Sequence, residues 1–301
     1  MNRIMLSLLL PVGWALASVA GAAEKTEYEK LIADQSAAFV TVKFMLKVEG
    51  GFGDGEDESE ITGVMIEPDG LVLCSNGALG GSRFFRRMGS IRPTDIKVLI
   101  GDDTEGLPAK LVARDSELDL AWVRLDQPGE KPFPHLDLTK AASPSVGHRL
   151  LALRRMGKFF DRAFVASDGK VCGKVRKPRE LYVPGGGLEV ERGMPVFAED
   201  GRVVGVVITQ MPDAEEMQGG YRALMLSGGR DMFSSMILPA AEVLKATERA
   251  KKAKPLDEEE EGEAEAGAKT DAAEKPGGKP AQPADKQDED DEDDEDDDGD
   301  E

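Results

Sequence analysis

Residues 62–79 read TGVMIEPDGLVLCSNGAL, with two apolar runs on either side of a Pro-Asp-Gly segment. Glycine readily adopts the positive φ that tight turns require, so Pro68–Gly70 is predicted to be a turn. The runs on either side are rich in β-branched residues, which favour strands. We therefore predict strands at Ile61–Ile66 and Leu71–Leu73.

Short runs of the same kind recur along the chain at the spacing of an all-β domain. A proline-rich segment, DQPGEKPFP at 126–134, divides them into two sets and is the best candidate for a link between two halves. Further strands are predicted at 39–46, 96–100, 109–113 and 120–125 before the link, and at 148–153, 164–174, 180–183, 194–197, 203–209 and 221–225 after it.

Helical spacing of apolar residues predicts a short helix at Glu27–Ala38 and a second one from Ile237 to about Ala253. The segment Gly50–Glu60 is rich in glycine and acidic residues and is predicted to be a loop. We expect an all-β double barrel, with residues 24–126 forming the N-terminal half and residues 127–254 the C-terminal half and its helix.

The first 22 residues have the features of a secretory signal peptide. A basic start is followed by an apolar run at Ile4–Ala20 and by small residues at a cleavage site. The alternative is an uncleaved anchor, but the run is short for a bilayer span. We expect cleavage, no stable membrane span afterwards, and an exported protein that is periplasmic or secreted.

Nearly all of the net charge of −20 lies at the C-terminal end. Residues 256–301 hold 23 acidic residues and four lysines, which leaves the rest of the chain nearly neutral. With so few apolar residues, the segment 255–301 is predicted to be a disordered acidic tail. It is a candidate for weak binding of divalent cations or a basic partner, and the simpler interpretation is a solubilising tail. No basic stripe is present, so nucleic acid is not an expected partner.

Three segments together resemble the HtrA/Deg-type trypsin-like serine proteases. They are the quoted run at 62–79, AKLVARDSELDLAWVRL at 109–125, and ERGMPVFAEDGRVVGV at 191–206. A weaker match, VGHRLLAL, lies at 146–153. The resemblance covers about residues 27–253 and implies a trypsin-like double β-barrel with a C-terminal helix.

The resemblance also places the catalytic triad on this chain. The histidine position holds Gly77, the aspartate position holds Asp119, and the serine position holds Arg192. Glycine has no base, and arginine stays protonated and is no nucleophile. Without an imidazole to orient, Asp119 is expected to make a cap or turn hydrogen bond near the start of a strand. Arg192 is expected to pair with a carboxylate, either of a peptide or of Asp119.

The loop before Arg192 also differs from the family pattern. Val190 stands where the family has glycine, and a β-branched residue disfavours a backbone that points two N–H groups at one oxygen. Met194 replaces a second glycine. We expect Val190, Arg192 and Gly193 to line the former active-site cleft and to have no catalytic role.

Other candidate nucleophiles and bases do not fall on catalytic positions. His135 and His148 are the two histidines, and neither matches the family's base. Cys74 and Ser75 precede Gly77 without a recognisable base. Cys74 and Cys172 permit a disulfide in an oxidising compartment, but two separate buried thiols are the simpler interpretation.

The sequence thus predicts an inactive trypsin-like protein that acts as a polypeptide-binding or regulatory module, with exported polypeptides as partners. The alternative is a serine-type hydrolase with residual or unconventional activity. No metal-ligand spacing, nucleotide loop or dinucleotide fingerprint appears in the sequence, so we expect no cofactor and no metal.

Overall fold

The computed structural model describes residues 25–50, 54–81, 89–210 and 234–253. The expected signal peptide, the strand expected at Tyr221–Met225 and the acidic tail lie outside these residues. Within the described part of the chain, no helix combines the length and the apolar character that crossing a bilayer requires.

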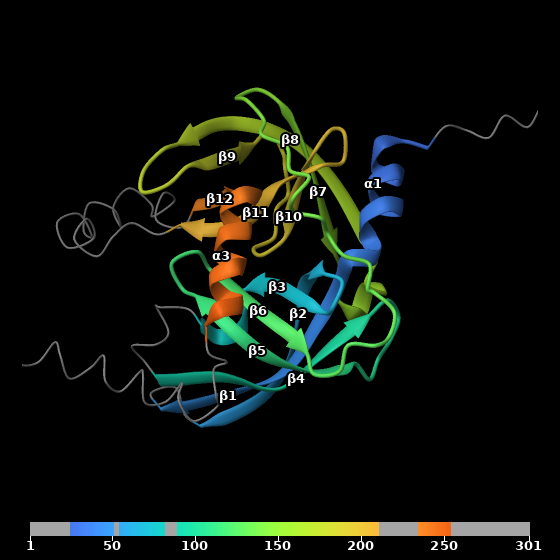
Figure 1. Ribbon diagram of the computed structural model, residues 1–301, viewed down its shortest axis with the longest axis vertical. Helices are drawn as coiled ribbons and strands as arrows, with labels where there is room; N and C mark the ends of the chain where they lie inside the picture. Colours follow the sequence, from blue (N-terminus) through green and yellow to red (C-terminus); the bar gives the residue numbers. More distant parts are fainter. Residues whose placement is uncertain (1–24, 51–53, 82–88, 211–233, 254–301) are drawn as a thin grey trace, which may run out of the picture. The chain divides into compact units, whose positions relative to one another are not determined.

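Two closed six-stranded barrels make up the described chain (Figure 1), which confirms the predicted all-β double barrel. In the first barrel the strands are joined in the order β1-β2-β3-β6-β5-β4, and in the second in the order β10-β11-β12-β9-β8-β7. The first barrel consists of β1 (Phe39–Gly50), β2 (Gly55–Glu67), β3 (Leu71–Ser75), β4 (Gly89–Ile100), β5 (Leu107–Asp115) and β6 (Leu120–Leu125). The second consists of β7 (Arg149–Arg155), β8 (Phe164–Val175), β9 (Leu181–Gly185), β10 (Pro195–Ala198), β11 (Val203–Gln210) and β12 (Ser234–Pro239).

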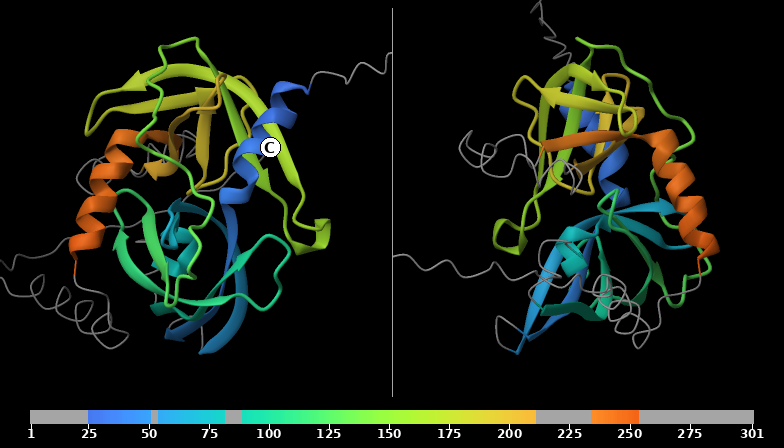
Figure 2. Two further views of the ribbon diagram at one scale, coloured as in Figure 1. Left: turned by 45° about the vertical axis from the view of Figure 1, so that its right-hand side comes forward. Right: turned by 90° about the vertical axis from the view of Figure 1, so that its left-hand side faces the viewer.

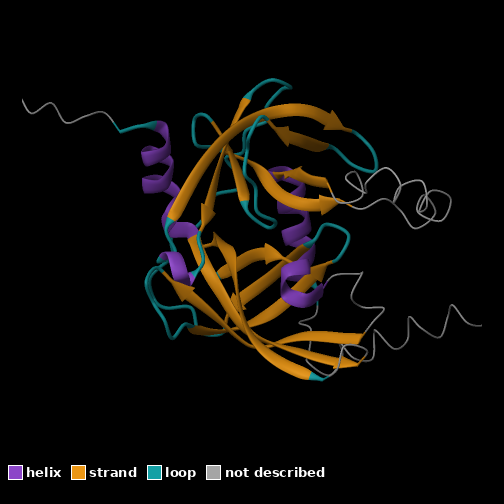
Figure 3. Ribbon diagram, turned by 180° about the vertical axis from the view of Figure 1, so that it is seen from behind, coloured by secondary structure: helices purple, strands orange, loops and turns teal. Residues whose placement is uncertain are grey.

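Helices occupy the two ends of the described chain (Figure 3). Helix α1 (Glu27–Gln35) begins with a capping box between Thr26 and Glu29 and continues into a short 3₁₀ turn, η1 (Ser36–Ala38). Helix α3 (Ala240–Lys252) follows the last strand, with Pro239 at its N-cap.

The predicted start of the last helix was wrong. Ile237 and Leu238 belong to β12, where they pair with Val207 and Val206 of β11. A short apolar run before a proline fits a buried strand as well as a helix, and the need to close the second barrel decides for the strand.

The predicted loop at Gly50–Glu60 was also wrong, because β2 already begins at Gly55. Its acidic residues lie opposite lysines of β1, with Lys43 paired to Glu60 and Lys47 to Glu56 in the register. Lys43 also forms an ion pair with Glu58 at 2.7 Å. Opposite charges across a strand pair are favourable, so this part of β2 pairs with β1 although its own residues form no apolar face.

Apolar side chains pack in three clusters. One fills the first barrel and includes Val42 and Val123, and another fills the second barrel and includes Val196 and Val207. The largest cluster joins residues of both barrels to α1 and α3. The two barrels are therefore held together by a shared hydrophobic core.

Trp122 of β6 anchors α3 in this shared core. Its side chain is 1% exposed, and its indole N–H donates a hydrogen bond of 3.1 Å to Oγ1 of Thr247 on α3. The Thr247 hydroxyl in turn donates to the carbonyl of Val243. Helix α3, which follows the second barrel, is thus hydrogen-bonded to β6 of the first. Figure 2 shows α3 beside both barrels.

Replacement of Thr247 tests this anchor. Thr247→Val keeps the shape but leaves the buried Trp122 N–H without its acceptor, which costs about 1–3 kcal/mol. We expect the free energy of unfolding, measured by urea denaturation, to fall by that amount. Thr247→Ser keeps the hydroxyl and is expected to lose about 1 kcal/mol or less. Equal losses in both variants would mean that the methyl group, not the hydrogen bond, matters.

Candidate functional site: the contact of the two barrels at Gly77, Asp119 and Arg192

The three positions that the resemblance assigns to a catalytic triad lie together in the structure. Gly77 follows the end of β3 in the short turn η2 (Gly77–Gly81), Asp119 lies in the turn between β5 and β6, and Arg192 precedes β10. A methyl group added to Gly77 would lie 3.0 Å from Oδ1 of Asp119 and 3.8 Å from Nη1 of Arg192. The space next to Gly77 is therefore bordered by a carboxylate and a guanidinium group.

The carboxylate of Asp119 holds the chain after β3 in place. Its Oδ1 accepts a hydrogen bond of 2.6 Å from the backbone N–H of Gly77, and its Oδ2 accepts one of 3.1 Å from the Ser75 hydroxyl. Asp119 has a φ of +54°, a conformation that aspartate tolerates better than most residues. We expected a cap or turn hydrogen bond near the start of a strand, and the observed bonds join Asp119 to the end of β3 and to the turn that follows it.

Burial raises the pKa of Asp119 above its ordinary value of 3.8. The hydrogen bonds from Gly77 and Ser75 and the positive charge of Arg192 oppose this rise without reversing it. Arg192 is therefore near enough to act on Asp119 electrostatically, while its side chain as a whole remains exposed.

The turn that contains Arg192 packs closely against the end of β3. Met194 donates its backbone N–H to the carbonyl of Glu191, and Gly193 between them has a φ of +80°, as the third residue of a type II turn requires. A methyl group on Gly193 would lie 2.5 Å from the backbone nitrogen of Ser75. Glycine at 193 is what allows the two barrels to meet here.

The other residues of this loop serve packing. The N–H of Gly193 donates to the carbonyl of Val207 at 2.7 Å, so it is engaged within the second barrel. Met194 is 1% exposed and belongs to the shared core, and Val190 packs against the core of the second barrel. Of the three residues expected to line the cleft, Val190 and Arg192 line a hollow at the surface, whereas Gly193 is buried.

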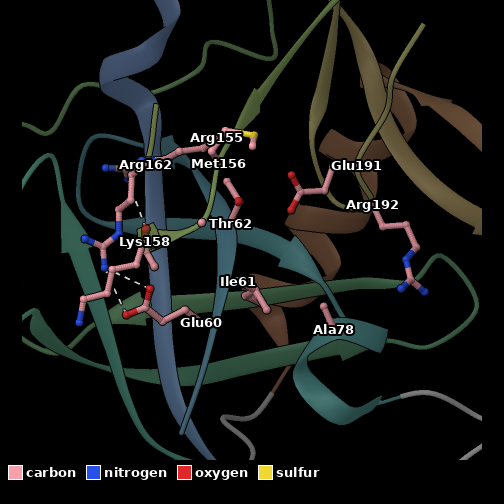
Figure 4. A pocket seen from close by; sticks show the side chains of 12 residues that line it. Glu60, Ile61, Thr62, Ala78, Arg155, Met156, Lys158, Arg162, Glu191 and Arg192 are labelled. Atoms are coloured by element: carbon pink, nitrogen blue, oxygen red, sulfur yellow. Dashed lines mark hydrogen bonds and ion pairs between the residues drawn. The ribbon is translucent and has the colours of Figure 1, made fainter. Parts of the chain in front are cut away.

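A pocket of about 250 Å³ adjoins Arg192 and receives residues from both barrels (Figure 4). In this view the side chains of Arg155, Lys158 and Arg162 gather at one end, and Glu191 and Arg192 lie at the other. The lining consists of Thr41, Glu60, Ile61, Thr62, Ala78, Arg155, Met156, Gly157, Lys158, Arg162, Glu191 and Arg192.

Sequence reasoning missed the basic residues of this pocket. Arg155 ends β7, an otherwise apolar strand that reads RLLALRR at 149–155. Two arginines at the end of a buried strand were the available signal, but only the fold shows that Arg162, seven positions later, lines the same pocket.

The alternative nucleophiles and bases stay apart from this pocket. Ser75 is 1% exposed, and Cys74 is fully buried, where burial raises the pKa of its thiol to about 12. His135 lies near the carbonyl of Phe133, and His148 accepts a hydrogen bond from the N–H of Ser145. Both cysteines are free, and the expectation that both are buried was wrong, because Cys172 is exposed.

A comparison with known families identifies part of the chain. Residues 61–206 match the family model of the trypsin-like peptidase domain. This segment is a trypsin-like peptidase domain. The match spans β2 to β11 and contains Gly77, Asp119 and Arg192. Among curated proteins, no sequence matches the chain.

Three solved structures are similar to this chain. The MamO protease domain from Magnetospirillum magneticum has 16% identity and a TM-score of 0.43, with 71% of this chain and 97% of that chain covered. The HtrA-type protease AlgW with a tripeptide has 15% identity and a TM-score of 0.46, with 73% and 62% covered. Rv3671c from M. tuberculosis, an inactive serine-to-alanine mutant, has 16% identity and a TM-score of 0.46, with 75% and 93% covered.

The two thiols of the trypsin-like domain are expected to differ in reactivity. The thiolate is the reactive form, and Cys74 is buried with a pKa raised to about 12, so it should resist alkylation. Iodoacetamide should modify Cys172 in the native protein and both cysteines in guanidinium chloride, as measured by mass spectrometry. Rapid native modification of Cys74 would contradict its placement.

The raised pKa of Asp119 predicts a pH effect on stability. Between its ordinary pKa and the raised value, the folded chain retains a proton that the unfolded chain has released, so the contribution of this group to stability falls as the pH rises. The Asp119→Asn variant lacks this titration. Its Tm relative to the wild type should therefore increase as the pH rises from below the ordinary pKa of 3.8 towards neutrality.

Asp137 supplies a control of opposite sign. The hydroxyl of Thr139 and the ammonium of Lys140 lower the pKa of Asp137 to about 2, so its contribution to stability is lost as the pH falls. Asp137→Asn should lose Tm relative to the wild type over the same rise in pH. Parallel pH profiles for the two variants would refute the assignment for Asp119.

Proposed function

We propose that this trypsin-like domain no longer cleaves peptide bonds and acts as an exported module that binds or regulates other polypeptides. The observation that carries the proposal is the meeting of Gly77, Asp119 and Arg192 at the contact of the barrels. The arrangement keeps the acid of a triad and supplies neither an imidazole nor a hydroxyl at the other two positions.

The chemistry of peptide hydrolysis argues against activity here. A serine protease needs a base to take the proton of the nucleophile and a hydroxyl or thiol to attack the carbonyl. Gly77 offers no base, and the guanidinium of Arg192 is permanently charged and electron-poor. Loss of one triad member leaves some rate from binding and oxyanion donors, whereas two positions differ here.

The surroundings of Gly77 also oppose a simple repair. A side chain at this position would begin 3.0 Å from Oδ1 of Asp119, which is closer than ordinary van der Waals contact, so the carboxylate would have to move. That carboxylate is held by the Gly77 N–H and the Ser75 hydroxyl. A side chain at position 77 would therefore disturb the hydrogen bonds that hold Asp119.

Binding remains available to a fold that has lost this chemistry. The pocket beside Arg192 draws lining residues from both barrels, as ligand sites between two halves often do. On the β7–β8 connection beside it, Phe159 and Phe160 are 91% and 56% exposed. Large exposed apolar groups next to a hollow are typical of interaction sites. The signal-like residues 1–22 support export, and hence exported polypeptides as partners.

A hydrolase with residual activity is the alternative, and the described residues favour it less. The hydroxyl bonded to Asp119 belongs to Ser75, which is buried. It donates to the Asp119 carboxylate and accepts a hydrogen bond of 3.2 Å from the Ala78 N–H. Cys74, with its raised pKa, is no better placed to attack a substrate.

Proteolysis of unfolded casein tests the proposed inactivity. We expect no cleavage and no labelling by a fluorophosphonate probe, both for the wild type and for the Gly77→His/Arg192→Ser double variant. Gel analysis and mass spectrometry would measure this, with trypsin as a positive control. Stoichiometric labelling of the wild type would overturn the proposal. If the wild type cleaves casein at a rate that Asp119→Asn leaves unchanged, the active site lies elsewhere.

A further inference from the structure

Arg155 is a buried cation at one end of the pocket, and its hydrogen-bond acceptors are neutral. The residue is 8% exposed, and its guanidinium donates to Oγ1 of Thr41 at 3.3 Å and to the carbonyl of Gly101 at 2.7 Å. Within the part of the chain that the structure describes, its Nε has no hydrogen-bond partner. The ring of Phe164, 5.7 Å away, gives partial compensation.

A second guanidinium lies close to the first. Arg162 forms an ion pair of 3.1 Å with Glu60, and among the described residues its buried Nε also lacks a partner. Burial, and then the charge of Arg162, lower the pKa of Arg155. Glu60 and Asp102 attract Arg155 from a greater distance. A buried charge that lacks a close counter-charge is costly, so this end of the pocket would be stabilised by an anion.

The remaining charges of the lining favour the same ligand. Lys158 and Arg192 add two cations, and Glu191 is the second carboxylate after Glu60. Burial raises the pKa of Glu191, so its own negative charge is disfavoured. The lining therefore carries an excess of positive charge in a domain that is close to neutral.

An aromatic pair borders this basic pocket. Phe159 and Phe160 follow Lys158 directly, and their rings meet edge to face with centroids 5.0 Å apart. They line an adjoining hollow that shares Arg155, Lys158 and Arg192 with the pocket. A ligand in the pocket that continues past Lys158 would therefore meet an apolar surface.

We propose that this pocket binds an acidic side chain of an extended polypeptide, whose carboxylate receives charge-assisted hydrogen bonds from Arg155 and Arg162 and whose apolar neighbour packs on Phe159 and Phe160. The inference rests on the proposed function and names its ligand class. A flat anionic membrane is a poorer fit, because the guanidinium of Arg155 is recessed between the barrels.

Fluorescence anisotropy on the full chain tests the proposal with two labelled hexapeptides, Gly-Phe-Glu-Glu-Phe-Gly and its Gln-Gln counterpart. The acidic residues after position 256 repel acidic peptides, so the measurement belongs at 0.15 M salt, where the screening length is about 8 Å. We expect the Glu-Glu peptide to bind at least about tenfold more tightly, as charge-paired contacts allow.

Variants of the lining assign the effect to this pocket without disturbing the buried Arg155. Lys158→Glu should weaken binding of the Glu-Glu peptide by at least about fivefold. Glu60→Gln removes the competing carboxylate from Arg162 and should strengthen binding. Lys131→Glu is the matched control, because it makes the same charge change on an exposed lysine outside the lining and should leave affinity within about twofold.

The outcomes separate this inference from the proposed function. Equal affinity for the two peptides, or equal effects of Lys158→Glu and Lys131→Glu, would overturn the inference and leave polypeptide binding intact. Failure of both peptides, and of a random peptide pool, to bind would overturn both. Binding to anionic lipid vesicles that depends on Phe159 and Phe160, without peptide binding, would assign the aromatic pair to a membrane and refute the inference.

Discussion

The close approach of Gly193 to the end of β3 is the constraint on which the arrangement of the site depends. A methyl group at Gly193 would come within 2.5 Å of the Ser75 nitrogen and 2.9 Å of the Cys74 carbonyl carbon. Because backbone atoms cannot yield as a flexible side chain does, this position excludes any side chain without a shift of one barrel. The contact fixes where Arg192 emerges, and so sets its distance from Gly77 and Asp119.

Asp119 shows why part of a catalytic arrangement persists where the reaction is proposed to be lost. Its carboxylate accepts hydrogen bonds from the backbone of Gly77 and from the Ser75 hydroxyl, and neither bond involves the side chain at 77. Removal of the carboxylate would leave the buried Ser75 hydroxyl and the half-buried Gly77 N–H without this acceptor, at a cost of about 1–3 kcal/mol for the buried group. The aspartate thus stabilises the fold independently of any catalytic role.

Sequence reasoning predicted the architecture well and the site only in part. Apolar runs and turn residues predicted most of the strands. A barrel buries one face of each strand, and this burial requires apolar residues that can be recognised in the sequence. It misplaced β12, since Ile237 and Leu238 fit a helix equally well until the pairing with β11 is known. Sequence reasoning missed the first part of β2, from Gly55 to Glu60, which is stabilised by opposite charges on the partner strand β1. The basic pocket could not be predicted for the same reason, because only the fold brings Arg155 and Arg162 next to Thr41 and Glu60 of the other barrel.

Each terminal helix packs on the barrel that lies farther from it in the sequence. Helix α1 precedes the first barrel and packs on β8 of the second, where Tyr28 is hydrogen-bonded to Asp168. Helix α3 follows the second barrel and packs on β5 of the first. Each helix is thus tied to both barrels, to one through the chain and to the other through packing. The two halves should therefore melt in a single cooperative transition, despite having separate interiors, and a cut in the link between them should not allow them to drift apart.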